Sequence, residues 1–184
     1  MAEKRFSIGD EGVGKEDYSN FVEELRRNMD PSSRTILIVD DEKGIRKKVA
    51  RDMRCFLPGA VICEAANGRE ALAELAEIRT KYYSDPLLIV LDLNMPVMDG
   101  WELIDALRKD YEEKGRSSGI PVIVLSSTSG EKGRLFGKKS VHGGKGGYSP
   151  LVSIAKETCV DRSRYDGAGE KGLLAWVEHF VKKA

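Results

Sequence analysis

Short apolar runs alternate with amphipathic stretches through the middle of the chain. The runs at 35–39, 87–91 and 120–125 predict buried strands, and weaker runs at 60–63 and 150–155 predict two more. Uninterrupted runs of this kind are typical of parallel sheets, because helices cover both faces of the sheet. Strands that alternate with helices predict an α/β fold, in which right-handed crossovers place helices on both sides of one parallel sheet.

Apolar residues recur at helical spacing between and after these runs. The sets are Ile45, Val49, Met53 and Phe56; Ala71, Leu72, Leu75 and Ile78; Leu103, Ile104, Leu107 and Tyr111; and Leu173, Leu174, Val177, Phe180 and Val181. We expect the first helix to stop at Leu57-Pro58-Gly59 and the second to begin at Asn67-Gly68. The last set predicts an amphipathic helix near the C-terminus.

The chain is long enough for one well-cored domain with extensions, and short for two. Residues 1–33 are expected to be an N-terminal extension, and 34–184 a single domain. The extension predicts one amphipathic helix, which either folds back on the domain or serves in docking or dimerisation; its apolar face is Tyr18, Phe21, Val22, Leu25 and Met29. Within the domain, 126–147 and 157–170 are rich in glycine and carry little apolar periodicity.

Three aspartates stand at the ends of two predicted strands. Asp40 and Asp41 follow the run 35–39, and Asp92 follows the run 87–91. Sites in open α/β sheets form beside the carboxyl ends of the strands, so these carboxylates should meet if the strands are neighbours. Because like charges repel, a hard cation such as Mg²⁺ would be needed to hold them, which indicates phosphoryl transfer. Alternatively, Asp40 and Asp41 would cap the helix that follows.

The composition of the chain argues against several kinds of partner. The 30 Lys and Arg residues balance 30 Asp and Glu residues, which argues against a nucleic-acid partner. No apolar run approaches the roughly 20 residues that span a membrane, and the first residues lack the apolar segment of a signal peptide. Cys55, Cys63 and Cys159 show no Cys-x-x-Cys spacing. We therefore expect a cytoplasmic protein with reduced thiols and no membrane partner.

Two segments around these aspartates resemble the signatures of response-regulator receiver domains. They are Val39-Asp40-Asp41-Glu42 and Leu91-Asp92-Leu93-Asn94-Met95-Pro96-Val97-Met98-Asp99-Gly100. The segments 67–72 and 121–127 also resemble the family, whereas the chain is atypical after residue 128. The resemblance implies a flavodoxin-like (βα)₅ fold, a doubly wound sheet of five parallel strands in the order 2-1-3-4-5. It also implies that a histidine kinase or phosphotransfer protein supplies a phosphoryl group.

The resemblance implies a role for each residue of the site. Asp92 would be the phosphoacceptor, so the chain would catalyse its own phosphorylation and dephosphorylation there without being a conventional enzyme. Asp40, Asp41, Asp92 and the backbone carbonyl of Asn94 would hold Mg²⁺. Ser126 would hydrogen-bond a phosphoryl oxygen, with Ser127 as the rival. Pro96 would fix the loop after Asp92, and Gly100 would permit a turn.

The family's lysine after strand five is the point of departure, because no Lys-Pro pair occurs here. Lys156 follows the run 151–155 and is the best candidate, with Lys145 and Lys171 behind it. An alternative alignment uses Gly147-Tyr148 and would put Leu151 at the lysine position, leaving the site without this cation. The family's switch aromatic would correspond to Ser153, so Tyr148 is a possible substitute.

We expect a receiver enlarged between its fourth strand and its last helix. It would signal to a downstream protein through the face formed by the fourth helix, fifth strand and fifth helix. The alternative is a degenerate receiver that acts as a phosphorylation-independent interaction module, supported by the missing lysine motif. A dehalogenase-type hydrolase would need a second aspartate where Asn94 stands, and the glycines of 143–147 lack the spacing of a nucleotide-binding loop.

Overall fold

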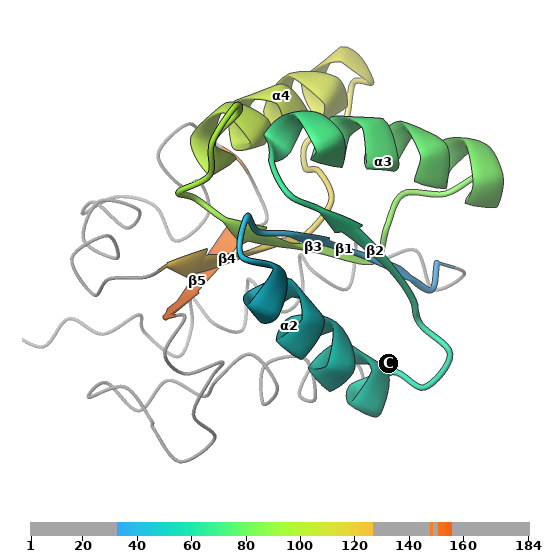
Figure 1. The fold of residues 1–184 in the computed structure, drawn as a ribbon. Helices are drawn as coiled ribbons and strands as arrows, with labels where there is room; N and C mark the ends of the chain where they lie inside the picture. The colour runs from blue at the N-terminus through green and yellow to red at the C-terminus, as the bar shows by residue number, and fades with distance from the viewer. Residues whose placement is uncertain (1–32, 127–147, 149–150, 156–184) are drawn as a thin grey trace, which may run out of the picture.

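The computed structural model describes residues 33–126, 148 and 151–155. They form a five-stranded parallel sheet in the order β2-β1-β3-β4-β5, with helix α2 on one face and α3 and α4 on the other (Figure 1). The strands are β1 (Thr35–Val39), β2 (Val61–Ala65), β3 (Leu88–Asp92), β4 (Val122–Ser126) and β5 (Leu151–Ala155). The helices are α2 (Lys43–Phe56), α3 (Gly68–Tyr82) and α4 (Gly100–Glu113). The predicted flavodoxin-like strand order is confirmed.

Strand boundaries differ from the predicted runs by one or two residues. Strand β2 starts at Val61 and continues to Ala65, and β3 includes Asp92 itself. Strand β4 begins at Val122, after the proline that the sequence placed inside it. Pro121 has no N–H to donate, but its carbonyl accepts a hydrogen bond from Ile89 N at 2.8 Å. Proline therefore stands just before the strand while its carbonyl still binds β3.

The core lies on both sides of the central strands. Every residue of β1 and β3 is buried, whereas Val61 on the edge strand β2 is exposed. The helical periodicities predicted for the three described helices are confirmed, because inward positions are buried; these are Val49 and Met53 on α2, Ala71, Leu75 and Ile78 on α3, and Leu103, Ile104, Leu107 and Tyr111 on α4. The sheet thus separates two apolar layers.

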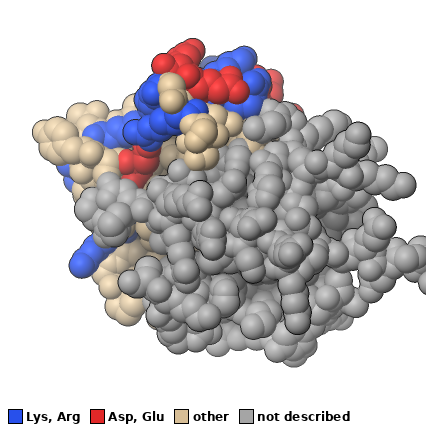
Figure 2. Space-filling view, turned by 180° about the vertical axis from the view of Figure 1, so that it is seen from behind, with Lys and Arg blue, Asp and Glu red and all other residues tan. Residues whose placement is uncertain are grey.

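Charged side chains tie α3 to α4 on the outside of one layer. Figure 2 shows Lys and Arg side chains intermingled with Asp and Glu at the top of the molecule. At the C-terminal end of α3, Arg79 donates to Asp85 at 2.6 Å and to both carboxylate oxygens of Asp110 on α4, at 3.0 and 2.7 Å. A two-pronged guanidinium contact of this kind fixes the relative position of the two helices.

Tyr148 closes the core at the N-terminal end of β4. The ring is 1% exposed, and its hydroxyl donates to Ile120 O at 2.6 Å. It meets Tyr111 edge to face at a centroid distance of 5.4 Å, and a Cβ on Gly119 would lie 2.6 Å from the Tyr148 hydroxyl. Burial raises the pKa of Tyr148 well above its usual value, so the hydroxyl remains a donor. Because Ile120 lies just before the first residue of β4 and Ser126 is its last, the structure does not support Tyr148 as the switch aromatic.

Several predicted features lie outside the described residues. They are the N-terminal and C-terminal amphipathic helices, Ser127, Lys145, Lys156 and Lys171. Among the helices that are described, none is both long and apolar enough to cross a membrane.

Candidate functional site

Three carboxylates converge at the carboxyl edge of the sheet. One oxygen each of Asp40, Asp41 and Asp92 all lie within 4.8 Å of one another. Strands β1 and β3 are parallel neighbours, with Val39 opposite Leu91, so the residues that end them arrive at the same place. Asp40 and Asp92 are buried, with 1% and 2% exposure, while Asp41 is exposed. The site is thus open to solvent on the Asp41 side.

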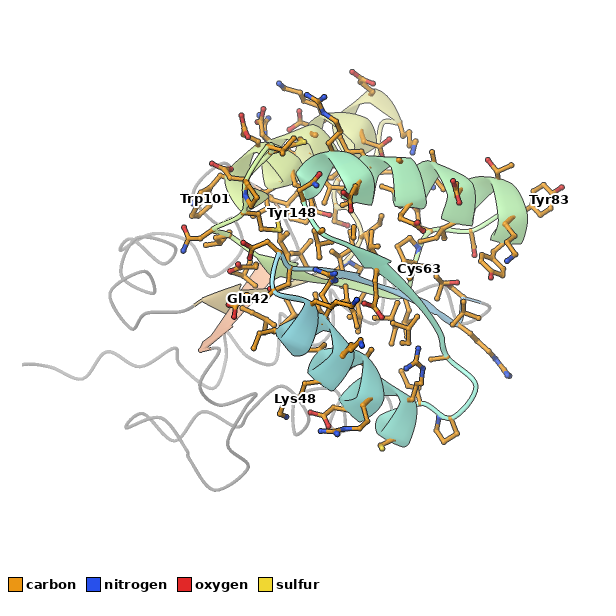
Figure 3. The ribbon with its side chains drawn as sticks, in the orientation of Figure 1. Glu42, Lys48, Cys63, Tyr83, Trp101 and Tyr148 are labelled. Atoms are coloured by element: carbon orange, nitrogen blue, oxygen red, sulfur yellow. The ribbon has the colours of Figure 1, made fainter. Side chains whose placement is uncertain are left out.

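The loop after β1 is held by hydrogen bonds to its backbone. Asp40 N donates to Ala65 O of β2 at 3.2 Å, and Asp40 Oδ1 accepts from Glu42 N at 2.8 Å. Helix α2 has Glu42 as its N-cap, and the Glu42 side chain itself makes no capping hydrogen bond. Asp40 binds the N–H of the N-cap residue, so its carboxylate contacts the start of α2 as well as the acid cluster. Glu42 and Trp101, at the start of α4, lie at the same end of the molecule, and Tyr83 lies at the far end of α3 (Figure 3).

Gly100 packs against the backbone that carries Asp92. A Cβ on Gly100 would lie 2.4 Å from Asp92 O and 2.7 Å from Leu93 Cα. Gly100 N also donates to Leu93 O at 3.0 Å, which closes the loop between β3 and α4. A capping box between Asp99 and Glu102 starts α4 at this point. Gly100 is thus the first residue of a helix and is required for close approach, not for the turn that the sequence predicted.

The same loop is anchored to the start of α3. Gly68 N donates to Met98 O at 3.0 Å, and a Cβ on Gly68 would lie 2.8 Å from Met98 Cγ. Met98 N donates to Pro96 O at 2.8 Å, which makes a three-residue turn around Val97 with a φ of 72°. Asn94 is exposed while its neighbours Leu93 and Met95 are buried. The loop is therefore fixed on both sides of Asn94.

The donor set fits a hard divalent cation. Three carboxylates supply only oxygen atoms, which suit Mg²⁺ and not the softer metals that prefer sulfur or imidazole. Two of these carboxylates are buried, where repulsion between like charges is weakly screened, so a bound cation would relieve it. Residues Asp40, Asp41 and Asp92 could hold the ion, together with the backbone carbonyl of Asn94.

Magnesium should stabilise the protein through Asp41. At about 100 times its Kd, Mg²⁺ should raise the free energy of unfolding by about 2.7 kcal/mol, because it binds only the folded site. Asp41→Ala removes one anionic ligand and should reduce this increment, as measured by urea unfolding with EDTA or MgCl₂. Glu113→Ala, which changes an exposed carboxylate at the end of α4, should keep the full increment. Equal increments in both variants would contradict the assignment of Asp41.

The register of β4 and β5 bears on the remaining predicted residues. Ser126 ends β4 and pairs with Ala155, and Asp92 pairs with Leu125, so the backbone of Ser126 reaches the edge that carries the acids. Leu151 pairs with Val122 at the opposite end of β4. This register disfavours the alignment that gave Leu151 the position of the family's lysine. Lys156 itself is outside the described part of the chain.

The comparisons with known proteins agree with this architecture. The family model of the response regulator receiver domain matches residues 36–139, which is more than half of the chain. The chain belongs to the response regulator receiver family. This receiver therefore has the fold and strand order of a domain type of two-component signalling.

Curated relatives of this receiver include two transcriptional or response regulators. It is 37% identical over 106 residues to the transcriptional regulatory protein PrrA of Mycobacterium leprae, covering 58% of this chain and 40% of that protein. It is 40% identical over 100 residues to the nitrate/nitrite response regulator protein NarL of Escherichia coli K12, covering 54% and 41%. The chain thus spans about two fifths of the length of these relatives.

A solved structure supports the fold. The phosphorylated cyanobacterial phytochrome response regulator RcpA superposes with a TM-score of 0.52 at 23% identity, covering 83% of this chain and 96% of that one. At this identity the likeness concerns the receiver fold alone.

Proposed function

We propose that this receiver takes a phosphoryl group from a histidine kinase or phosphotransfer protein onto Asp92, with Mg²⁺ as its cofactor. The observation that carries the proposal is the cluster of Asp40, Asp41 and Asp92 within 4.8 Å at the carboxyl edge of the sheet. A buried nucleophile beside two further carboxylates is suited to phosphoryl transfer, where a metal offsets charge and the nucleophile is held in line.

Phosphoryl transfer to Asp92 exchanges one bond to phosphorus for another. A carboxylate oxygen of Asp92 forms a bond to phosphorus while the bond from phosphorus to the donor's imidazole nitrogen breaks, and that nitrogen keeps the electron pair. In dephosphorylation, a water oxygen bonds to phosphorus while the bond from phosphorus to the Asp92 carboxylate breaks, so the carboxylate is regenerated. Bound Mg²⁺ would neutralise the charge of the carboxylates and the phosphoryl oxygens. The chain would catalyse both steps on itself.

Ser126 and Lys156 would contact the phosphoryl group on Asp92. The Ser126 hydroxyl would donate to a phosphoryl oxygen, and the Lys156 ammonium would pair with another. Support for Lys156 comes from its place in the sequence directly after Ala155, which pairs with Ser126. These contacts form only in the phosphorylated state, so they would bias the receiver toward a signalling conformation.

The proposed function also assigns the rest of the chain. Residues 1–33 are an extension, and 34–184 are one receiver enlarged between β4 and its last helix. The signal passes to a downstream protein through the surface formed by β5 and the helices on either side of it. The balance of 30 basic and 30 acidic residues favours a protein partner over nucleic acid. Cysteines without Cys-x-x-Cys spacing favour the cytoplasm, and the lack of a long apolar run favours a protein that binds no membrane directly.

Phosphoryl uptake tests the proposal. Acetyl phosphate with Mg²⁺ should add one phosphoryl group to the wild type, measured by intact mass, and should add none to Asp92→Asn or in the presence of EDTA.

Lys156→Ala should still take up the group, because the nucleophile and metal ligands remain. It should lose the distant amide shifts that beryllofluoride, a stable phosphoryl mimic, induces in the wild type. No adduct and no shifts in the wild type would favour the degenerate interaction module.

A further inference from the structure

Arg46 reaches back from α2 to the loop that carries the acid pair. Its Nη1 donates to Asp40 O at 2.5 Å and to Asp41 O at 3.2 Å. The guanidinium side chain is only 14% exposed, so it is held against the protein and not extended into solvent. A single cationic side chain thus binds the backbone carbonyls of two of the three clustered aspartates.

The charge of Arg46 is balanced on its other side. Its Nε lies 3.4 Å from Glu64 Oε2, and Glu64 stands on the edge strand β2, opposite Ile38 of β1. The contacts toward the site are to carbonyl oxygens, which are dipoles and not charges. Arg46 therefore links α2, the loop after β1 and the edge of the sheet in one arrangement.

We propose that Arg46 is a positioning residue for the cation site: it fixes the backbone of Asp40 and Asp41 so that their carboxylates converge on the ion. The inference rests on the proposed function, since it assumes that these carboxylates hold Mg²⁺. The loop is held by two kinds of contact, because Arg46 donates to its carbonyls and Asp40 Oδ1 accepts from Glu42 N. Removing an outer-shell group that holds metal ligands in place typically weakens metal binding by about 10–100-fold.

A positioning role and a purely electrostatic role for Arg46 predict opposite changes in Mg²⁺ affinity when the side chain is removed. If Arg46 acted only through its positive charge, its removal would reduce repulsion with the incoming cation and tighten Mg²⁺ binding. If it positions the ligands, its removal should weaken binding even though a positive charge is lost. The direction of the change therefore separates the two roles.

Mg²⁺ affinity measured by isothermal titration calorimetry on the full chain tests this inference. Arg46→Met should raise the Kd about tenfold, the lower end of the range for outer-shell partners of metal ligands. Arg46→Lys keeps the charge and can reach a carbonyl with one nitrogen. Its Kd should therefore lie between those of the wild type and Arg46→Met. Arg51→Met removes an exposed cation from the same helix and should leave the Kd unchanged.

A second readout does not depend on bound metal. In the metal-free protein, the amide NMR shifts of Asp41 and Glu42 should both move in Arg46→Met, because the carbonyl before each amide loses its donor. At least one of the two should move in Arg46→Lys, which can donate to only one carbonyl. If Arg46→Met does not fold, Arg46→Lys carries the test, since a Kd above the wild-type value cannot then come from lost charge. Wild-type affinity or tighter in the folded Arg46 variants would overturn the inference. No Mg²⁺ binding by the wild type would instead overturn the proposed function.

Discussion

Replacing Gly100 with alanine should lower the free energy of unfolding by about 3 kcal/mol, the upper end of the cost of overpacking. The added methyl would lie 2.4 Å from Asp92 O and 2.7 Å from Leu93 Cα, which are backbone atoms and cannot rotate away. Either α4 or the end of β3 must shift, and Asp92 moves with β3. Urea unfolding followed by circular dichroism measures the loss, and phosphoryl uptake should fall with it.

The matched control is Gly44→Ala on α2. Gly44 is also in the first turn of a helix, but a Cβ there would meet nothing within 4 Å. Alanine loses less conformational freedom on folding than glycine, so this variant should gain about 0.5–1 kcal/mol. If Gly100→Ala were as stable as the wild type, the close approach between α4 and β3 would be wrong.

Tyr148→Ala should cost about 3–5 kcal/mol, the usual cost of truncating a buried aromatic side chain. The ring is packed against Tyr111 and Gly119, and no small side chain could fill the space that it leaves. Tyr148→Phe should cost about 1 kcal/mol, because only the hydrogen bond to Ile120 O is lost. Thermal or urea unfolding of both variants separates the packing contribution from that of the hydroxyl.

Tyr83→Ala is the control for the aromatic truncation. Tyr83 is 93% exposed at the end of α3, so its removal should change the stability by less than about 0.5 kcal/mol. A cost for Tyr148→Ala that equals the cost for Tyr83→Ala would contradict the packing of Tyr148 in the core. The two tyrosines thus test whether Tyr148 itself is packed in the core beside Ile120.

The sheet could be predicted from the sequence because uninterrupted apolar runs show which strands are buried on both faces. The meeting of Asp40, Asp41 and Asp92 followed from the same pattern once β1 and β3 were neighbours. Strand ends were less predictable, since they depend on single features such as the missing N–H of Pro121. The roles of Asp92, Ser126 and Lys156 in phosphorylation stay predictions.

Other parts of the site left no periodic signal in the sequence. Arg46 binds carbonyls five and six positions earlier, a contact that depends on how α2 leaves the sheet. Gly100 was expected at a turn, but only the packing of α4 on the end of β3 makes its missing side chain necessary. Tyr148 was considered as a switch residue, and the register of β4 and β5 was needed to place it at the opposite edge.

Asp92 itself should carry the phosphoryl group, and borohydride trapping can locate that group in the sequence. Borohydride reduces an aspartyl phosphate to homoserine, which peptide mass spectrometry locates in the sequence. After treatment with acetyl phosphate and Mg²⁺, we expect homoserine at position 92 and at no other aspartate. Homoserine at position 40 or 41, or a phosphoryl adduct that leaves position 92 unreduced, would mean that Asp92 is not the phosphoacceptor.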